Sequence, residues 1–343
     1  MGGERGLLLA VDAGGTLTRA VILDPTGRCV GFGRAGGGNP TSAGVPAALE
    51  SVFTATAMAA GQAAGRIDLS LAAVAMAGAV HRGLGDTIRD RLAPLGLDGP
   101  VVVEPDLLAM YHSGTTTPDG HVLVAGTGSV SAAVRGGSLE TVADGLGWLV
   151  GDAGSGFWIG HRIVRRVADA IDGVAPPTAL TGLLLEALGL TASAERIRGR
   201  PLVLMELIDR VYAERPVQLA RFAPLAFRAG GDPAARDILT EAAASLARTL
   251  AAVRPAGSAG PVVLGGSVLG ALLAGDSTLA EPLTTALGPA ERIPVRDGLA
   301  GAAVLALLRR GIAVDDEIFD RVRRELAAVQ AETAGEERVA LPW

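Results

Sequence analysis

The sequence predicts an α/β protein made of two lobes of similar design. A strand-like apolar run, a glycine turn that carries Thr or Ser, and a second strand-like run occur in that order twice, roughly 110 residues apart. The length of 343 residues corresponds to about two domains of roughly 150 residues each. Because 49% of the residues are hydrophobic and 19% are charged, both lobes can bury a large core.

The first lobe is expected to begin with three strands joined by tight turns. Leu7–Val11 is a continuous apolar run that stops at Asp12-Ala-Gly-Gly15, and the turn Asp24-Pro-Thr-Gly27 separates the next two runs. Small and apolar residues at helical spacing then predict a helix, and two further apolar runs predict buried strands. These elements are strands at Arg19–Leu23, Arg28–Phe32, Leu71–Met76 and Val101–Val103 and a helix at Ala47–Ala64.

The second lobe repeats the opening pattern and then becomes mostly helical. His121–Ala125 stops at the turn Gly126-Thr-Gly-Ser129, and apolar residues at helical spacing dominate residues 157–255. A short strand then runs into Gly265-Gly-Ser267 and an apolar helix, and two further helical segments follow. The remaining elements are strands at Val130–Val134, Leu139–Val142 and Pro261–Leu264 and helices at Asp297–Leu308 and from Glu317 onward.

Charge and composition exclude several classes of function. The 30 basic and 36 acidic residues give a formal charge of −6 without a basic stripe, which argues against nucleic acid and anionic membranes as partners. All basic residues are Arg, so the lysine of a P-loop, of a protein kinase and of a pyridoxal Schiff base is missing. No apolar run approaches the ~18 residues of a membrane span.

Cysteine and histidine usage indicates a protein without a structural metal. Cys29 is the only cysteine, so no disulfide forms within the chain and a cytoplasmic location is expected. The 4 histidines are scattered without ligand spacing, which argues against a structural zinc or iron–sulfur site.

Three glycine turns are candidates for binding a nucleotide. In Asp12-Ala-Gly-Gly-Thr-Leu-Thr18 and in Gly126-Thr-Gly-Ser129, backbone N–H groups and hydroxyls can approach phosphates. A carboxylate at a strand end, such as Asp12, can hold Mg²⁺ through water. Gly265-Gly-Ser267 lets a flat ligand such as adenine or ribose lie on the backbone. Each turn alone is equally typical of an ordinary glycine hairpin.

Two further features suggest a ligand with hydroxyl groups. The glycine-dense segment from Gly145 to Gly160 contains Asp152 for hydrogen bonds and two Trp rings, at 148 and 158, for packing on something flat. The alternative is a tightly packed structural loop. Asn39 is the only Asn in a chain whose composition disfavours that residue, so it is either a chemical contact or a turn residue.

The order of these motifs resembles a known family. DxGGTxT, an xxDxxA strand end, AGTGS, GDxGSGxWIG and VLGGS together resemble the sugar kinases of the actin-like ATPase superfamily, in the N-acetylglucosamine kinase branch known as the BadF/BadG/BcrA/BcrD group. The resemblance runs from Leu7 to about Leu308. It implies two ribonuclease H-like lobes with an interlobe cleft, at residues 1–112 and 113–309, with a helical insertion in the second. A C-terminal helix at about 310–335 is expected to pack back on the first lobe.

The resemblance also implies roles for individual residues. Asp106, which follows Val101–Val103, matches the catalytic base, and Asp12 matches the residue near Mg²⁺. Ala13, Leu17, Leu146 and Ala153 depart from the usual motifs, and the last two leave the identity of the sugar open. The implied ATP-binding residues are Gly14, Gly15, Thr16, Thr18, Gly126, Thr127, Gly128, Ser129, Gly265, Gly266 and Ser267, and the implied sugar-binding residues are Asn39, Asp106, Thr127, Trp148 and Asp152.

The expected activity is transfer of the ATP γ-phosphoryl group to the 6-hydroxyl of N-acetyl-D-glucosamine by a homodimer. A glucosamine kinase of the same fold is the nearest alternative. An iron–sulfur ATPase activator would need more cysteines than Cys29, and a non-catalytic sugar sensor would need neither Asp12 nor Asp106. Asp106 also fits a simpler role as a helix N-cap after a strand.

Overall fold

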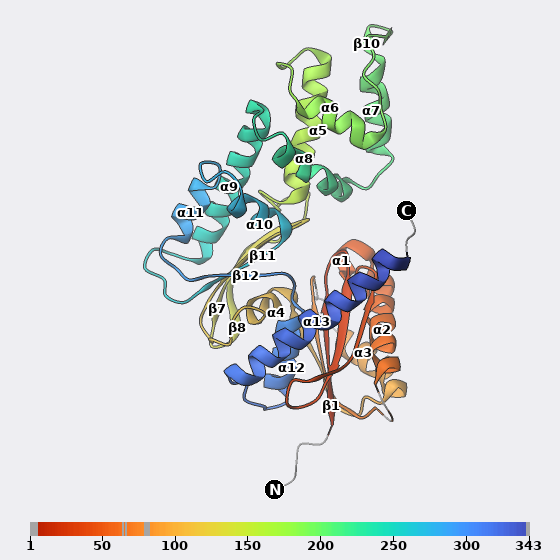
Figure 1. The fold of residues 1–343 in the computed structure, drawn as a ribbon, viewed down its shortest axis with the longest axis vertical. Coiled ribbons are helices and arrows are strands. Elements are labelled where there is room, and N and C mark those ends of the chain that lie inside the picture. Colours follow the sequence, from red (N-terminus) through yellow and green to blue (C-terminus); the bar gives the residue numbers. More distant parts are fainter. Residues whose placement is uncertain (1–5, 64, 66, 79–82, 341–343) are drawn as a thin grey trace. The chain divides into compact units, whose positions relative to one another are not determined.

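A computed structural model describes residues 6–63, 65, 67–78 and 83–340 and divides the chain into two compact units. Unit 1 contains residues 1–118 and 295–343, and unit 2 contains residues 119–294. Each is built on a five-stranded mixed sheet flanked by helices (Figure 1). The α/β class predicted from the repeated strand–turn–strand pattern is therefore confirmed.

The sheet of unit 1 has the order β3-β2-β1-β4-β5. The first three strands form an antiparallel meander, while β4 and β5 run parallel to β1. Parallel strands end at the same edge of the sheet, so the residues after β1, β4 and β5 lie at one edge. The strands are β1 (Leu7–Ala13), β2 (Thr18–Leu23), β3 (Cys29–Ala35), β4 (Leu69–Met76) and β5 (Val101–Pro105).

Helices cover both faces of this sheet. Leu9 and Val11 point to the face that packs on α2 and α3, and the alternating Leu8 and Ala10 are buried on the other face, where α12 packs on β1 and β4. The helix α13 packs on α12 and β3. The helices are α1 (Pro40–Ala43), α2 (Val45–Gln62), α3 (Leu84–Leu92), η1 (Ala93–Leu95), α4 (Asp106–His112), α12 (Leu299–Arg309) and α13 (Asp316–Ala340).

Unit 2 repeats the meander with a second sheet of order β12-β11-β6-β7-β8. Strands β6, β7 and β8 are antiparallel neighbours, and β11 runs parallel to β6. The glycine turn at 126–128 and the end of β11 therefore lie at one edge of the sheet. The strands are β6 (Gly120–Ala125), β7 (Ser129–Arg135), β8 (Ser138–Asp144), β11 (Val262–Gly265) and β12 (Arg292–Val295).

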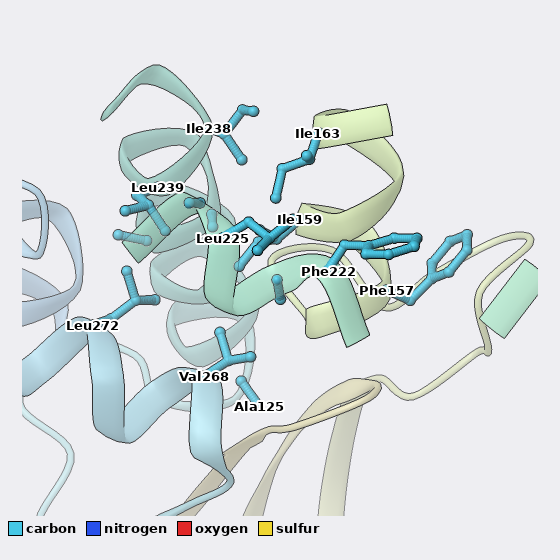
Figure 2. Packing of buried hydrophobic residues seen from close by; sticks show 14 of the residues in the cluster. Ala125, Phe157, Ile159, Ile163, Phe222, Leu225, Ile238, Leu239, Val268 and Leu272 are labelled. Atoms are coloured by element: carbon cyan, nitrogen blue, oxygen red, sulfur yellow. The ribbon is translucent and has the colours of Figure 1, made fainter. Parts of the chain in front are cut away.

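The helices of unit 2 share one aliphatic core. Figure 2 shows Ile159 and Ile163 of α5 beside Phe222 and Leu225. Ile238 and Leu239 of α9 belong to the same cluster. A small hairpin, β9 (Arg196–Ile197) with β10 (Arg200–Pro201), interrupts the helices. The helices are α5 (Gly156–Asp172), α6 (Leu180–Leu188), α7 (Leu202–Tyr212), η2 (Pro216–Phe222), α8 (Ala223–Arg228), α9 (Pro233–Val253), α10 (Ser267–Ala274) and α11 (Glu281–Leu287).

The boundary between the units differs from the expected one in a single element. The sequence order assigned residues 299–309 to the second lobe, whereas α12 lies in unit 1. The reason is close packing: a Cβ atom on Gly301 would lie 1.7 Å from the carbonyl oxygen of Ala109 in α4. Only glycine lets the two helix backbones approach that closely.

Candidate active site

An acidic cluster surrounds the end of β1 in unit 1. The hairpin register places Arg19 directly opposite Asp12, and Arg19 Nη1 lies 3.4 Å from Asp12 Oδ2. The same guanidinium lies 3.8 Å, through Nε, from Oδ2 of Asp297. The backbone N–H of Gly298 donates a hydrogen bond of 3.2 Å to Asp12 Oδ2. One arginine is thus shared between two carboxylates that are far apart in the sequence.

This environment changes the acidity of Asp12, which is only 6% exposed. The pKa of Asp12 is raised from 3.8 to about 7: burial is the largest cause, the negative charges of Asp297 and Asp106 also raise it, and Arg19 and the Gly298 N–H lower it. The cluster therefore carries more negative charge than Arg19 balances. A proton or a cation next to Asp12 would relieve that repulsion.

Asp106 lies at the same edge of the sheet, because it follows β5 and begins α4. Its Oδ1 accepts a hydrogen bond of 2.9 Å from the N–H of Leu107. Burial raises the pKa of the Asp106 carboxyl above its usual value, although the Leu107 N–H opposes that change. The N-cap position is taken by Pro105, so Asp106 does not have the simple capping role. A half-buried carboxylate with a raised pKa is suited to accepting a proton.

The first glycine turn presents only part of its motif to solvent. The Gly14 N–H donates to the Leu17 carbonyl at 3.1 Å, and Gly15 and Thr16 are exposed. Thr18, in contrast, is fully buried, and its hydroxyl has no hydrogen-bond partner among the residues that the structure describes. Gly15 and Thr16 are therefore accessible to solvent, while Thr18 contributes to packing inside the strand pair.

In unit 2 the second turn, the start of α5 and the third turn lie together. The turn closes with a hydrogen bond of 2.9 Å from Gly126 N–H to the carbonyl of Gly128, and the N–H of Gly156 donates to the Gly126 carbonyl at 2.7 Å. The third turn is equally close, since a Cβ atom on Gly266 would lie 2.3 Å from the carbonyl oxygen of Ala125. Thr127 and Ser267 are exposed at this edge, and Gly265 is buried at the end of β11.

Asp152 supports the second turn from below. Its Oδ1 accepts the N–H of Ser129 at 3.0 Å and leaves no space for a side chain at Gly128, whose Cβ would lie 2.7 Å away. The Ser129 hydroxyl donates to the carbonyl of Ala153 at 3.0 Å. Burial raises the pKa of Asp152, the nearby Asp144 raises it too, and the Ser129 N–H lowers it. Asp152 therefore has a structural role here, which agrees with the alternative interpretation of the glycine-dense segment as a tightly packed structural loop.

Two aspartates hold this segment in an unusual backbone conformation. Asp144 and Asp152 have φ values of 64° and 59°, in the left-handed region that few residues other than glycine occupy. The Asp144 carboxylate accepts the N–H of Asp152 at 2.7 Å through Oδ1 and the N–H of Ala153 at 3.0 Å through Oδ2. Such strain persists only where the surrounding contacts enforce it, and it is often found at functional sites.

The loop between these aspartates exposes an apolar surface. Trp148 is 41% exposed and meets the edge of Phe157 at a centroid distance of 5.7 Å. Phe157 in turn stacks on His161 at 5.7 Å with an interplanar angle of 6°. Leu146, Leu149 and Val150 are 67%, 77% and 73% exposed. Trp158 instead packs beneath the guanidinium of Arg162, so Trp148 is the ring that this loop presents.

Asn39 caps a helix in unit 1. Its Oδ1 accepts the Thr41 N–H at 2.8 Å, and Pro40 occupies the first position of α1. The turn role considered for this residue is therefore present. Its role toward a sugar stays a prediction.

Two residues that support the site were missed by sequence reasoning: Arg19 and Asp144. Asp297 begins the turn Asp297–Gly301, which the family resemblance implies to lie near the nucleotide. Arg19 could have been found from the hairpin, because a turn of this length pairs it with Asp12. The dipeptide Asp144-Gly145 at the end of a strand signals a tight turn. No local signal places Asp297 beside Asp12.

Two negative findings hold for the described part of the chain. Among those residues no group of three or more His, Cys, Asp or Glu side chains is arranged to hold a metal ion directly. No helix within the same residues is long and apolar enough to cross a membrane.

The family follows from a comparison with protein-family models. The model of the BadF/BadG/BcrA/BcrD ATPase family matches residues 9–306 of this chain. The chain belongs to this family. The resemblance carried by the five glycine and aspartate motifs is thereby confirmed, and it agrees with a site built from glycine turns and carboxylates without lysine.

Three curated relatives are similar to parts of the chain. An N-acetyl-D-glucosamine kinase of Dictyostelium discoideum is 35% identical over 150 residues, which is 42% of this chain and 44% of that protein. The glucosamine kinase GspK of Vibrio cholerae is 28% identical over 259 residues, 73% of this chain and 81% of that protein. An N-acetylmuramic acid/N-acetylglucosamine kinase of Clostridium acetobutylicum is 27% identical over 110 residues, 32% of this chain and 36% of that protein. The match thus spans less than half of the first and third relatives.

Solved structures show the same fold. A Chromobacterium violaceum protein assigned as an N-acetylglucosamine kinase has a TM-score of 0.68 at 24% identity, over 88% of this chain and 99% of that one. A Porphyromonas gingivalis protein with the same assignment has a TM-score of 0.66 at 20% identity, over 88% and 99%. At these identities the likeness concerns the fold alone, and it confirms the actin-like α/β architecture.

Proposed function

We propose that this chain is an ATP-dependent amino-sugar kinase that phosphorylates the 6-hydroxyl of N-acetyl-D-glucosamine. The observation that carries the proposal is a pair of carboxylates with raised pKa values, the buried Asp12 and the half-buried Asp106, at the edge of the sheet that also carries the exposed Gly15 and Thr16. Family membership supports ATP as the donor, and the relatives named above act on amino sugars.

In this proposal Asp106 is the general base. As the bond between the sugar O6 and the γ-phosphorus forms and the bond from that phosphorus to the β-phosphate oxygen breaks, the hydroxyl proton moves to the Asp106 carboxylate. The raised pKa of Asp106 increases its affinity for that proton. A positioned base of this kind contributes about 10²- to 10⁴-fold to the rate.

The glycine turns supply donors without lysine. In unit 1 Gly15 and Thr16 are exposed, and in unit 2 Thr127 and Ser267 are exposed beside the closely packed turns. Backbone N–H groups held in fixed turns stabilise phosphate charge at no cost of reorganisation. Each set is proposed to bind the nucleotide, the third turn at its adenosine.

The Asp12 cluster fits a magnesium ion. Mg²⁺ keeps several waters and is bound through one or two carboxylates together with substrate phosphates. This suits a carboxylate with an excess of negative charge and a chain whose described part has no set of three direct ligands. Asp12, with Asp297 beside it, would hold the ion. When bound, Mg²⁺ neutralises phosphate charge.

The apolar loop favours an N-acetylated sugar over a free amino sugar. Trp148, Leu146 and Val150 offer surface for an acetyl methyl group, and Ala153 replaces an acidic residue beside Asp152. Burial lowers the pKa of His161, which stacks on Phe157 beside Trp148, and the positive charges of Arg165 and Arg162 lower it further. The cationic 2-amino group of glucosamine would be disfavoured there. The proposal also includes a homodimer and a cytoplasmic location. Sedimentation of the purified chain would measure the mass and so test the dimer.

A coupled ADP-release assay tests the proposed activity. The purified chain is given ATP and Mg²⁺ with N-acetylglucosamine, glucosamine, N-acetylmannosamine or glucose in turn. We expect the highest kcat/KM with N-acetylglucosamine. Turnover of glucosamine alone would refute the choice of sugar, and turnover of none of the four would refute the kinase activity.

A further inference from the structure

The run Gly36-Gly37-Gly38 has no assigned role, although it immediately precedes Asn39. The strand register explains its position. Ala35, the last residue of β3, pairs with Thr18, and Thr18 pairs with Ala13 at the end of β1. To reach α1, the chain must therefore pass back over the turn that joins β1 to β2.

The passage brings two backbones into direct contact. The N–H of Gly38 donates a hydrogen bond of 2.8 Å to the carbonyl of Gly14. A Cβ atom on Gly37 would lie 2.4 Å from the carbonyl oxygen of Gly15, and one on Gly38 would lie 2.8 Å from the Ala13 Cβ. Neither Gly37 nor Gly38 has a positive φ, so space and not backbone conformation requires glycine at both positions.

On its other side, Asn39 packs against the residues that follow strand β4. A Cβ atom on Gly78, which follows the neighbouring strand β4, would lie 3.0 Å from Asn39 Oδ1 and 2.5 Å from Thr41 Oγ1. The hydroxyl of Ser51 in α2 holds the loop from a third direction by donating to the Gly37 carbonyl at 3.0 Å. Asn39, the proposed sugar contact, is thus attached to the backbone of the proposed phosphate turn.

We propose that Gly37 and Gly38 are positioning residues that couple sugar binding to nucleotide binding. Any movement of the loop on binding a sugar at Asn39 displaces Gly14 and Gly15, and any ordering of that turn by phosphates restricts Asn39. Because such coupling is reciprocal, each substrate tightens the other by the same factor. This inference rests on the proposed function, since it needs a sugar at Asn39 and phosphates at the turn.

Calorimetric titration tests the coupling directly. The dissociation constant of ADP with Mg²⁺ is measured with and without saturating N-acetylglucosamine, and the reverse titration is made with the sugar. The coupling factor is the factor by which one ligand lowers the dissociation constant of the other. In the wild type we expect the two titrations to give the same coupling factor, at least about fivefold, the lower end of typical coupling. If N-acetylglucosamine binds and is phosphorylated but leaves the ADP affinity unchanged, the coupling is refuted and the proposed function stands.

Variants then locate the coupling in the loop. Gly37→Ala should reduce the factor to within about twofold of unity and raise the KM of both substrates. The matched control is Gly36→Ala, because a Cβ there meets only Ser51 Oγ at 3.6 Å and the factor should stay at its wild-type value. Equal factors in these two variants would refute the role of Gly37.

A milder variant covers the case in which Gly37→Ala does not fold. Ser51→Ala removes the hydrogen bond to the Gly37 carbonyl without adding an atom to the crowded contact. It should lower the coupling factor part-way, while circular dichroism and the melting temperature stay near wild type. An unchanged coupling factor in a folded Ser51→Ala protein would count against the proposal that the Gly36–Gly38 loop couples the two binding sites. If no amino sugar binds the wild type, both the inference and the proposed function fail.

Discussion

Replacing Asp12 with asparagine should change how the free energy of unfolding depends on pH. Burial and two neighbouring carboxylates raise the pKa of Asp12 from 3.8 to about 7 in the folded chain. Between about pH 4 and pH 7 the folded protein therefore holds a proton that the unfolded chain has lost. Stability must fall as the pH rises through this window, and it levels off above pH 7.

The size of the effect follows from the shift. One pKa unit corresponds to about 1.4 kcal/mol, so ionising Asp12 removes about 4 kcal/mol of stability over the whole titration, from below pH 4 to above pH 7. About 3 kcal/mol of this falls between pH 5 and pH 8, a range in which unfolding can be followed without extreme acid. Asparagine keeps the shape of the side chain and carries no proton that titrates. The Asp12→Asn variant should therefore gain about 3 kcal/mol relative to wild type across that range.

Urea unfolding followed by circular dichroism at pH 5, 6, 7 and 8 measures this difference. Asp86→Asn is the control, because that carboxyl is 72% exposed on α3 and its removal should leave the pH profile parallel to wild type. Asp297→Asn tests the cause: removing its charge lowers the pKa of Asp12 and moves the fall in stability to lower pH. Parallel profiles for wild type and Asp12→Asn would show that Asp12 does not retain its proton, and the electrostatic argument for a cation site would be wrong.

Three further predictions concern activity. Asp106→Asn should lower kcat by at least about 100-fold and leave sugar binding largely intact, so a variant that keeps a tenth of the wild-type kcat contradicts the base assignment. Asn39→Ala should raise the KM for the sugar about 5- to 150-fold, since an unpaired buried hydroxyl costs roughly 1–3 kcal/mol, with the KM for ATP nearly constant. A lower melting temperature at an unchanged sugar KM would leave Asn39 as the helix cap alone. Trp148→Ala should lower kcat/KM for N-acetylglucosamine about tenfold, which is the scale of one apolar contact in a pocket, and should lower kcat/KM for glucosamine far less. Equal losses on both sugars would argue against the apolar loop as the acetyl contact.

The strand ends and glycine turns were predictable because their signals are local. A continuous apolar run that stops at a glycine fixes both the strand and the edge at which it ends, as at Asp12 after Leu7–Val11 and at Gly126 after His121–Ala125. The repeat of that pattern gave the second sheet. Both turns lie where the sequence placed them, since each is closed by a local hydrogen bond, from the Gly14 N–H to the Leu17 carbonyl and from the Gly126 N–H to the Gly128 carbonyl.

Other features depend on contacts that the local sequence does not encode. β12 was missed because it is a short strand at the edge of its sheet and contains Pro294, which weakens the strand pattern. The assignment of α12 to the second lobe followed chain order, whereas Gly301 fits this helix against α4 in unit 1. Gly298 lies 286 residues from Asp12 in the sequence and donates a hydrogen bond to it in the fold.

The Asp12 cluster bears on how a chain without lysine could balance phosphate charge. Arg19 is the cation closest to the first glycine turn in sequence, yet its guanidinium is shared between Asp12 and Asp297. Moving Arg19 to a phosphate would leave two carboxylates unbalanced in a buried site, at a cost of several kcal/mol per uncompensated charge. In the proposed function, the charge on a phosphate at this turn would therefore be met by backbone amides and by a cation held at Asp12. The raised pKa of Asp12 fits that proposal, because a carboxylate with an increased affinity for a proton would exchange that proton for the cation.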